Sequence, residues 1–98
     1  MPENIQRHSA ICKELTELYT RKNHDYGDSF HNTYLKWGLV MSAIRLEDKL
    51  QRFETLIRNP QKVSDESIRD TLIDLANYSI MTVMEIDASK NGENKCES

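Results

Sequence analysis

Apolar residues recur at helical spacing in three long segments of the chain. In the first segment, at about residues 4–21, the apolar stripe is narrow, whereas it is broader at about residues 32–57 and 65–89. The stripe of the second segment contains Leu35, Leu39, Ala43, Leu46, Leu50, Phe53 and Ile57. That of the third contains Ile68, Leu72, Leu75, Ala76, Ser79, Val83 and Ile86. The pattern predicts an all-α protein with three main helices.

Turn-forming residues separate these segments. Residues 23–32 hold Gly27 and several Asn, Asp and Ser side chains, which compete with helical hydrogen bonding, so this stretch is predicted to be a loop. Pro60 disfavours helical geometry at the residue before it, and Ser64 is placed to cap the third helix. Residues 92–98 are polar and follow Asn91. We therefore expect one helical domain over residues 1–91 and a disordered tail over residues 92–98.

The two broad apolar arcs are wider than one neighbouring helix can cover. A chain of 98 residues also buries only roughly 60–65% of its unfolded surface when it folds alone. We therefore predict an antiparallel helical bundle that is completed by oligomerisation, as a homodimer or homotetramer. A coiled coil is the competing structure, but the apolar positions extend beyond a two-in-seven seam.

Composition and charge narrow the choice of partners and of compartment. The chain has 13 basic and 16 acidic residues and a net charge of −3, without a basic run, so nucleic acid polymers are not expected partners. Cys12 and Cys96 have no neighbour at metal-ligand spacing. The N-terminus lacks the pattern of a signal peptide, and no apolar run reaches the length of a membrane span. We expect a soluble, cytoplasmic protein without a membrane partner.

One carboxylate falls inside the apolar arc of the second helix. At 100° per residue, Glu47 lies between apolar neighbours. A carboxylate buried there without a partner costs several kcal/mol or becomes protonated, so it has to meet a cation, a hydrogen-bond donor or a metal ion. One interpretation is a structural salt bridge with Arg45, Lys49 or Arg69, and the other is a metal site.

The third helix carries a second group of polar side chains. Asp70, Asp74 and Asn77 follow one another at spacings of four and three, which places them on one face. A solvated face is one interpretation of the two acids. The other is magnesium binding, because Mg²⁺ prefers oxygen ligands and takes one or two carboxylates together with substrate phosphates.

The segment 22–29 is rich in groups that bind a polar ligand. Lys22 can place an ammonium group near a phosphate, Tyr26 offers a flat ring for a base, and Gly27 lets the backbone approach closely. His24 is interpreted as a surface residue. A basic group on the second helix is either surface charge or a set of phosphate contacts. It consists of Arg45, Lys49 and Arg52.

These segments together resemble a known family, the nucleotide modification associated domain of type 1. The resemblance covers about residues 15–85 and rests on KNHDYGDS at 22–29, RLEDK at 45–49 followed by Arg52, DESI at 65–68 and DTLIDLANY at 70–78. That family is common in phages and bacteria and is similar to the MazG-like all-α NTP pyrophosphatases, which hydrolyse nucleoside triphosphates to monophosphate and pyrophosphate.

The resemblance implies a site built on acids. Glu47, Asp70 and Asp74 take the place of the metal-binding and catalytic acids of MazG-like enzymes. Those enzymes usually carry Glu-x-x-Glu on the first acidic helix and Glu-x-x-Asp on the second, whereas this chain has Ile44 and Thr71 at two of the positions. Because this chain has fewer of these acids than MazG-like enzymes, nucleotide binding without catalysis is the alternative to hydrolysis.

These inferences combine into one functional prediction. We expect a Mg²⁺-dependent hydrolase or binder of nucleoside triphosphates, including modified deoxynucleotides. Magnesium would be held by Glu47, Asp70 and Asp74, and the substrate would be contacted by Lys22, Asn23, Tyr26, Lys49, Arg52 and Asn77. The alternative is a non-catalytic helical interaction module whose acids keep an oligomer in solution.

Overall fold

The computed structural model describes residues 2–26, 28–59 and 65–90, and in these ranges the backbone forms four α-helices. They are α1 (Pro2–Tyr26), α2 (Ser29–Trp37), α3 (Leu39–Arg58) and α4 (Asp65–Lys90). None of these ranges contains a strand, so the predicted all-α class is confirmed. The predicted cap at Ser64 and the predicted tail at 92–98 lie outside the described residues. So do the side chains of Asp25, Tyr26, Asp65 and Glu66.

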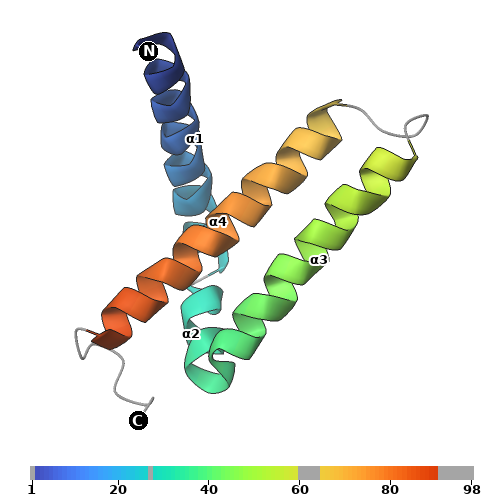
Figure 1. The fold of residues 1–98 in the computed structure, drawn as a ribbon. Helices are drawn as coiled ribbons and strands as arrows, with labels where there is room; N and C mark the ends of the chain where they lie inside the picture. Colours follow the sequence, from blue (N-terminus) through green and yellow to red (C-terminus); the bar gives the residue numbers. More distant parts are fainter. Residues whose placement is uncertain (1, 27, 60–64, 91–98) are drawn as a thin grey trace.

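The long helices α3 and α4 form the body of the molecule as an antiparallel pair (Figure 1). The short α2 packs against both, and α1 rests on α4. The N-terminal part of α1 extends away from the other helices (Figure 1). Residues 2–13 are all exposed. None of the described helices combines the length and the apolarity that a membrane crossing requires.

The prediction of a loop over residues 23–32 is wrong. α1 continues to Tyr26 and α2 begins at Ser29, so residues 23–26 and 29–32 are helical. Asp28, between the two helices, adopts a left-handed backbone conformation (φ 61°, ψ 36°), which Asp tolerates better than most residues. The backbone amide of Asn32 then donates to the Asp28 carbonyl oxygen at 3.2 Å. Packing of the C-terminal part of α1 on α4 outweighs the weak helix propensity of this segment.

The single helix predicted over residues 32–57 is divided at Gly38. This residue has φ 67° and ψ −151°, a combination that side chains with a Cβ rarely adopt. Its amide donates to the Tyr34 carbonyl oxygen at 2.7 Å, which closes α2. A Cβ at this position would meet no atom within 4 Å, so the requirement for glycine comes from the backbone angles rather than from crowding. The other predicted helix ends are confirmed, because α3 stops just before Asn59-Pro60 and α4 runs from Asp65 to Lys90.

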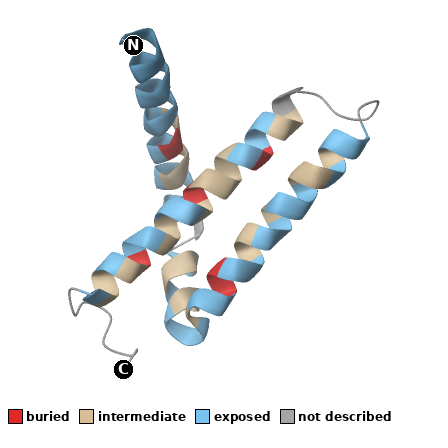
Figure 2. Cartoon of the chain, viewed as in Figure 1, coloured by how far each residue is buried: buried red, intermediate tan, exposed pale blue. Residues whose placement is uncertain are grey.

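The core of the single chain is small (Figure 2). Among the described residues, the only buried apolar side chains are Leu15 and Met41. Trp37 has a large apolar ring that is 67% exposed, because it ends α2 beside the Gly38 turn. Most of the predicted apolar stripes are therefore open to solvent. The large exposed apolar side chains are Ile5, Ile11, Leu35, Trp37, Leu39, Val40, Ile44, Leu50, Ile57, Leu72, Ile80, Val83 and Met84.

Polar contacts hold α1 and α2 on α4. The buried Asn77 donates from Nδ2 to the Leu15 carbonyl oxygen at 3.2 Å. The Arg69 guanidinium donates two hydrogen bonds of 2.7 Å to the Glu14 carboxylate, and these bonds lower the pKa of Glu14 below its usual value. In α2, Nδ1 of His31 lies 2.9 and 2.8 Å from the two carboxylate oxygens of the buried Glu85.

The buried hydroxyl of Ser42 leads to a stability prediction. Ser42 is 2% exposed, and its Oγ has no hydrogen-bond partner among the described residues. Because an unsatisfied buried hydroxyl costs about 1–3 kcal/mol, Ser42→Ala should raise the free energy of unfolding by about 1 kcal/mol. The melting temperature should rise by about 4–8 °C for a domain of this size.

Ser9→Ala is the matched control for this prediction. Ser9 lies in the exposed part of α1, so its replacement changes helix propensity by a similar amount without removing a buried hydroxyl. Thermal melts of the three proteins provide the comparison. A Ser42→Ala protein that melts below the parent would show that the hydroxyl is needed.

Candidate functional site

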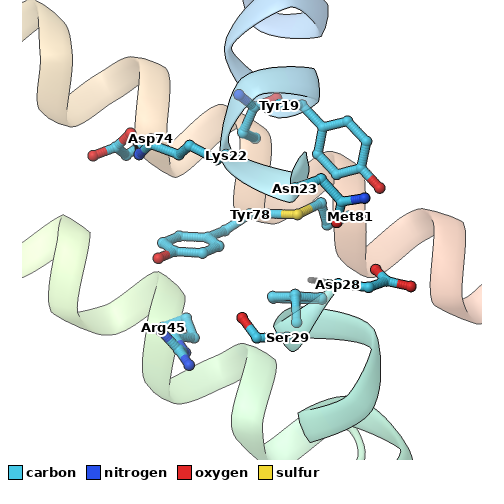
Figure 3. A pocket seen from close by; sticks show the side chains of 11 residues that line it. Tyr19, Lys22, Asn23, Asp28, Ser29, Arg45, Asp74, Tyr78 and Met81 are labelled. Atoms are coloured by element: carbon cyan, nitrogen blue, oxygen red, sulfur yellow. Dashed lines mark hydrogen bonds and ion pairs between the residues drawn. The ribbon is translucent and has the colours of Figure 1, made fainter. Parts of the chain in front are cut away.

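A pocket of about 340 Å³ lies where the C-terminal part of α1 meets α2, α3 and α4 (Figure 3). Its lining combines aromatic rings, cations, carboxylates and amides, which is a mixture typical of sites for polar, ring-containing ligands. The residues are Tyr19, Lys22, Asn23, Asp28, Ser29, Phe30, Arg45, Asp74, Asn77, Tyr78 and Met81.

Aromatic rings form one side of this pocket. The rings of Phe30 and Tyr78 are stacked, with their centroids 5.9 Å apart and an angle of 22° between their planes. The Arg45 guanidinium lies 5.9 Å from the Tyr78 centroid, within range of a cation–π contact. Burial, together with the charges of Asp28 and Glu85, raises the pKa of Tyr19, so its phenol stays protonated and can donate a hydrogen bond. The aromatic groups thus offer flat apolar surface next to a cation and a donor.

The Asp74 carboxylate joins three helices at the edge of the pocket. Oδ1 of Asp74 lies 3.3 Å from Nζ of Lys22 on α1, and Oδ2 lies 3.3 Å from Nζ of Lys49 on α3. The carboxylate is 24% exposed, whereas the Lys22 side chain is 55% exposed. Two ammonium groups are therefore held together at one acid. In Figure 3, the ring of Tyr78 points into the space between Lys22 and Arg45.

A second pocket of about 350 Å³ adjoins the first. The two pockets share Lys22 and Asp74. Asp70 lines this second pocket, so the face predicted from the spacing of Asp70 and Asp74 does border a hollow. The remaining lining residues are Glu14, Glu17, Leu18, Arg21 and Ile73.

The structure gathers some of the predicted site residues and separates others. Lys22, Asn23, Asp74 and Asn77 line the first pocket. Lys49 reaches this group through Asp74, and Asp70 lies in the adjoining pocket. Arg52 and Glu47 are exposed on α3 and line neither pocket. The side chain of Tyr26 lies outside the described residues.

Glu47 is not buried in this chain, which corrects the expectation that it lies within a covered apolar arc. It is exposed and accepts a hydrogen bond of 3.2 Å from Nε2 of Gln51, one turn along α3. The salt-bridge interpretation is wrong for its three candidate partners, because Lys49 pairs with Asp74, Arg69 pairs with Glu14 and Arg45 lies over Tyr78. The physical reason is that this arc of α3 faces solvent rather than α4.

This placement predicts a small effect of Glu47→Gln. We expect a change in the free energy of unfolding of less than about 0.5 kcal/mol, as for other exposed positions. We also expect nucleotide binding to be retained, because the side chain lines neither pocket. Thermal melts with EDTA and with magnesium, each with and without a nucleoside triphosphate, test both points. A strong loss of magnesium-dependent stabilisation would show that Glu47 is a metal ligand after all.

The positions of the three predicted acids agree only in part with a magnesium site. Within residues 2–26, 28–59 and 65–90, no three His, Cys, Asp or Glu side chains form a group that could hold a metal ion. Glu47, Asp70 and Asp74 are therefore not assembled into one site by a single chain. Asp70 and Asp74 do lie one turn apart beside the same hollow, and two carboxylates match the number that Mg²⁺ takes when phosphates supply other ligands.

Several residues of the pocket were missed by sequence reasoning. Tyr19 and Met81 carry no signal beyond their place in predicted helices, and Phe30 falls in the predicted loop. Arg45 belongs to the basic group that was interpreted either as surface charge or as phosphate contacts. Tyr78 belongs to the block 70–78 that carried the family resemblance, which was the one available indication of its importance.

Comparison with known proteins yields one family. The family model described as nucleotide modification associated domain 1 matches residues 22–86, about two thirds of the chain. The matched range contains every residue that lines the first pocket except Tyr19. No curated protein and no solved structure matches the chain.

Proposed function

We propose that this chain, which belongs to the family of nucleotide modification associated domain 1, binds a nucleoside triphosphate together with Mg²⁺ in the pocket between α1, α2, α3 and α4. The observation that carries the proposal is the meeting of aromatic rings with Lys22 and Arg45 in one pocket. Bases bind proteins through stacking on rings, and phosphates bind through Lys and Arg.

The aromatic side of the pocket is suited to the base. Stacking on Phe30 and Tyr78 tolerates many base structures, because every base has a flat π-face. This tolerance agrees with a ligand range that includes modified deoxynucleotides. Asn23 and the protonated phenol of Tyr19 line the same space and can form hydrogen bonds with the base or sugar.

The cationic side is suited to the phosphates. Lys22 and Lys49 are held near each other by Asp74, and Arg45 approaches from α3. When a triphosphate enters, its oxygens would compete with the Asp74 carboxylate for the two ammonium groups. The carboxylate would then be released from its two pairs and become available to a metal ion.

Asp70 and Asp74 would hold the Mg²⁺ ion. The ion would neutralise phosphate charge and would lower the pKa of a water molecule bound to it. Glu47 is left out of this ligand set because it is exposed and lines neither pocket. In this respect the proposal is narrower than the three-acid site expected from the sequence.

The proposal extends to hydrolysis. In that reaction, water attacks the α-phosphorus, the bond to the bridging oxygen breaks, and pyrophosphate leaves with the nucleoside monophosphate as the second product. Lys22 and Lys49 would stabilise the charge that develops on the leaving pyrophosphate. The proposal includes a cytoplasmic location, where free nucleotides are available.

One series of assays tests both nucleotide binding and hydrolysis. Normal and modified nucleoside triphosphates are titrated into the protein with magnesium and with EDTA, and pyrophosphate release is followed in the same samples. Magnesium-dependent binding with pyrophosphate release supports a hydrolase, and binding without release supports a nucleotide-binding protein. If no triphosphate binds at millimolar concentration, the alternative of a helical interaction module replaces the proposal.

A further inference from the structure

The face of the α3–α4 pair that lies opposite the pocket carries two apolar stripes. On α3, the spacing of three and four residues joins Leu39, Ala43, Leu46, Leu50, Phe53 and Ile57. On α4, it joins Leu72, Leu75, Ser79, Val83 and Ile86. None of these side chains is buried in the single chain. Leu50 is 45% exposed and Val83 is 54% exposed.

Helical geometry places these stripes away from the pocket. At 100° per residue, Leu50 lies about 140° around α3 from Arg45, and Val83 lies about 140° around α4 from Tyr78. Arg45 and Tyr78 both line the pocket on the side of α1 and α2. In Figure 1, α4 crosses in front of α1, and no described helix covers the α3–α4 pair on the side facing the reader. The stripes thus belong to one open face.

The solvent-accessible surface of the chain is larger than that of a compact monomer of the same mass. A compact monomer of this mass exposes about 5,800 Å², whereas this chain exposes 7444 Å². Part of the excess belongs to the exposed N-terminal half of α1. A stable obligate dimer needs a total interface of about 2,000 Å² or more, or about 1,000 Å² from each chain. On the α3–α4 face itself, large apolar side chains keep 41–56% of their surface exposed, so this face has apolar area to contribute to such an interface; they are Leu39, Leu50, Ile57, Leu72 and Val83.

We infer that the open face of α3 and α4 binds the same face of a second copy of this chain, which makes a homodimer with a four-helix core. A self-complementary apolar face is the kind of surface that a two-fold interface uses. Stripes with three- and four-residue spacing on antiparallel helices also pack as they do in four-helix bundles. The pocket stays accessible because it lies on the opposite side of α3 and α4. The inference does not depend on which ligand the pocket binds.

Sedimentation equilibrium of the full chain tests this interface. The parent should behave as a dimer of twice the 11.5 kDa chain mass. Leu50→Glu and Val83→Glu each place a charge in the apolar contact, and each should raise the dissociation constant about a hundredfold or more. Ile5→Glu is the matched control, because Ile5 is also a large exposed aliphatic residue (67%) but lies in the N-terminal part of α1, outside the proposed interface. This variant should remain a dimer.

The concentration dependence of melting is a second readout that does not need a folded variant. Because dimerisation is linked to folding, the melting temperature of the parent should rise with protein concentration. A parent that stays monomeric at about 100 µM, with a melting temperature independent of concentration, would overturn the inference. It would also be overturned by an oligomer that Ile5→Glu dissociates while Leu50→Glu and Val83→Glu do not.

Discussion

Tyr78→Ala should weaken nucleotide binding about tenfold to a hundredfold. The ring of Tyr78 stacks on Phe30, lies next to Arg45 and lines the pocket. A base stacked on an aromatic side chain is worth about 1–3 kcal/mol, and removal of this ring also leaves Phe30 without its neighbour. Isothermal titration with a nucleoside triphosphate and magnesium measures the change in dissociation constant.

Two controls separate stacking from packing in this experiment. Tyr78→Phe keeps the ring and should bind within about threefold of the parent, because no hydrogen bond of the Tyr78 hydroxyl is part of the proposed site. Trp37→Ala removes an aromatic residue that is 67% exposed and lines neither pocket, so affinity should not change. If Tyr78→Ala melts like the parent and binds with unchanged affinity, the base does not stack at this ring.

Asp74→Asn should affect both stability and magnesium dependence. The carboxylate pairs with Lys22 and Lys49, so its neutralisation leaves two ammonium groups near each other without a counter-charge. All three side chains are partly exposed, so the loss should be about 1–2 kcal/mol, below the cost of breaking a fully buried pair. The melting temperature should fall by about 4–8 °C per kcal/mol. Magnesium should no longer strengthen nucleotide binding, because an amide is a poorer Mg²⁺ ligand than a carboxylate.

Asp70→Asn separates the loss of a magnesium ligand from the loss of the ion pairs that Asp74 forms with Lys22 and Lys49. Asp70 is exposed and borders the second pocket, and no lysine within the described part of the chain forms an ion pair with it. This variant should melt like the parent and still lose part of the magnesium dependence. If Asp74→Asn lowers the melting temperature and leaves the magnesium dependence intact, Asp74 serves only to join α1, α3 and α4.

The sequence was sufficient for the elements with strong local signals. The apolar spacing from Ile68 to Ile86 and the Pro60 stop are properties of neighbouring residues, and α4 and the end of α3 follow from them. The short segment around Asp28 was harder. Its Asn, Asp and Ser residues weaken a helix, but only the packing of α1 on α4 decides how far the helix continues.

The break at Gly38 was not predictable from pattern alone. Leu35 and Leu39 keep helical spacing across it, and an isolated glycine within a helix is common enough to be tolerated. The positive φ that divides the helix follows from how α2 turns back onto α3 and α4. Trp37 is exposed for the same reason, since the turn directs the end of α2 outward.

The candidate site also combines features that the sequence predicts with features that depend on how the helices pack. The helix spacing placed Asp70 and Asp74 on one face, and in the structure both line the second pocket. The residue types of segment 22–29 and the family resemblance both drew attention to that segment. The environment of Glu47 could not be derived, because a helical wheel shows which residues share a face but not whether that face is covered. The roles of Tyr19 and Arg45 depend on where four helices meet, and residue spacing within one helix carries no information about that.

The most direct test of the nucleotide pocket is to map the bound ligand by NMR on the parent protein. A nucleoside triphosphate with magnesium is titrated into the ¹⁵N-labelled chain, and the amide resonances are followed. The account predicts that the largest shifts occur at pocket residues on separate helices, including Asn23, Ser29 and Asn77. Shifts confined to the exposed N-terminal half of α1 or to the open face of α3, or no shifts at millimolar nucleotide, would contradict it.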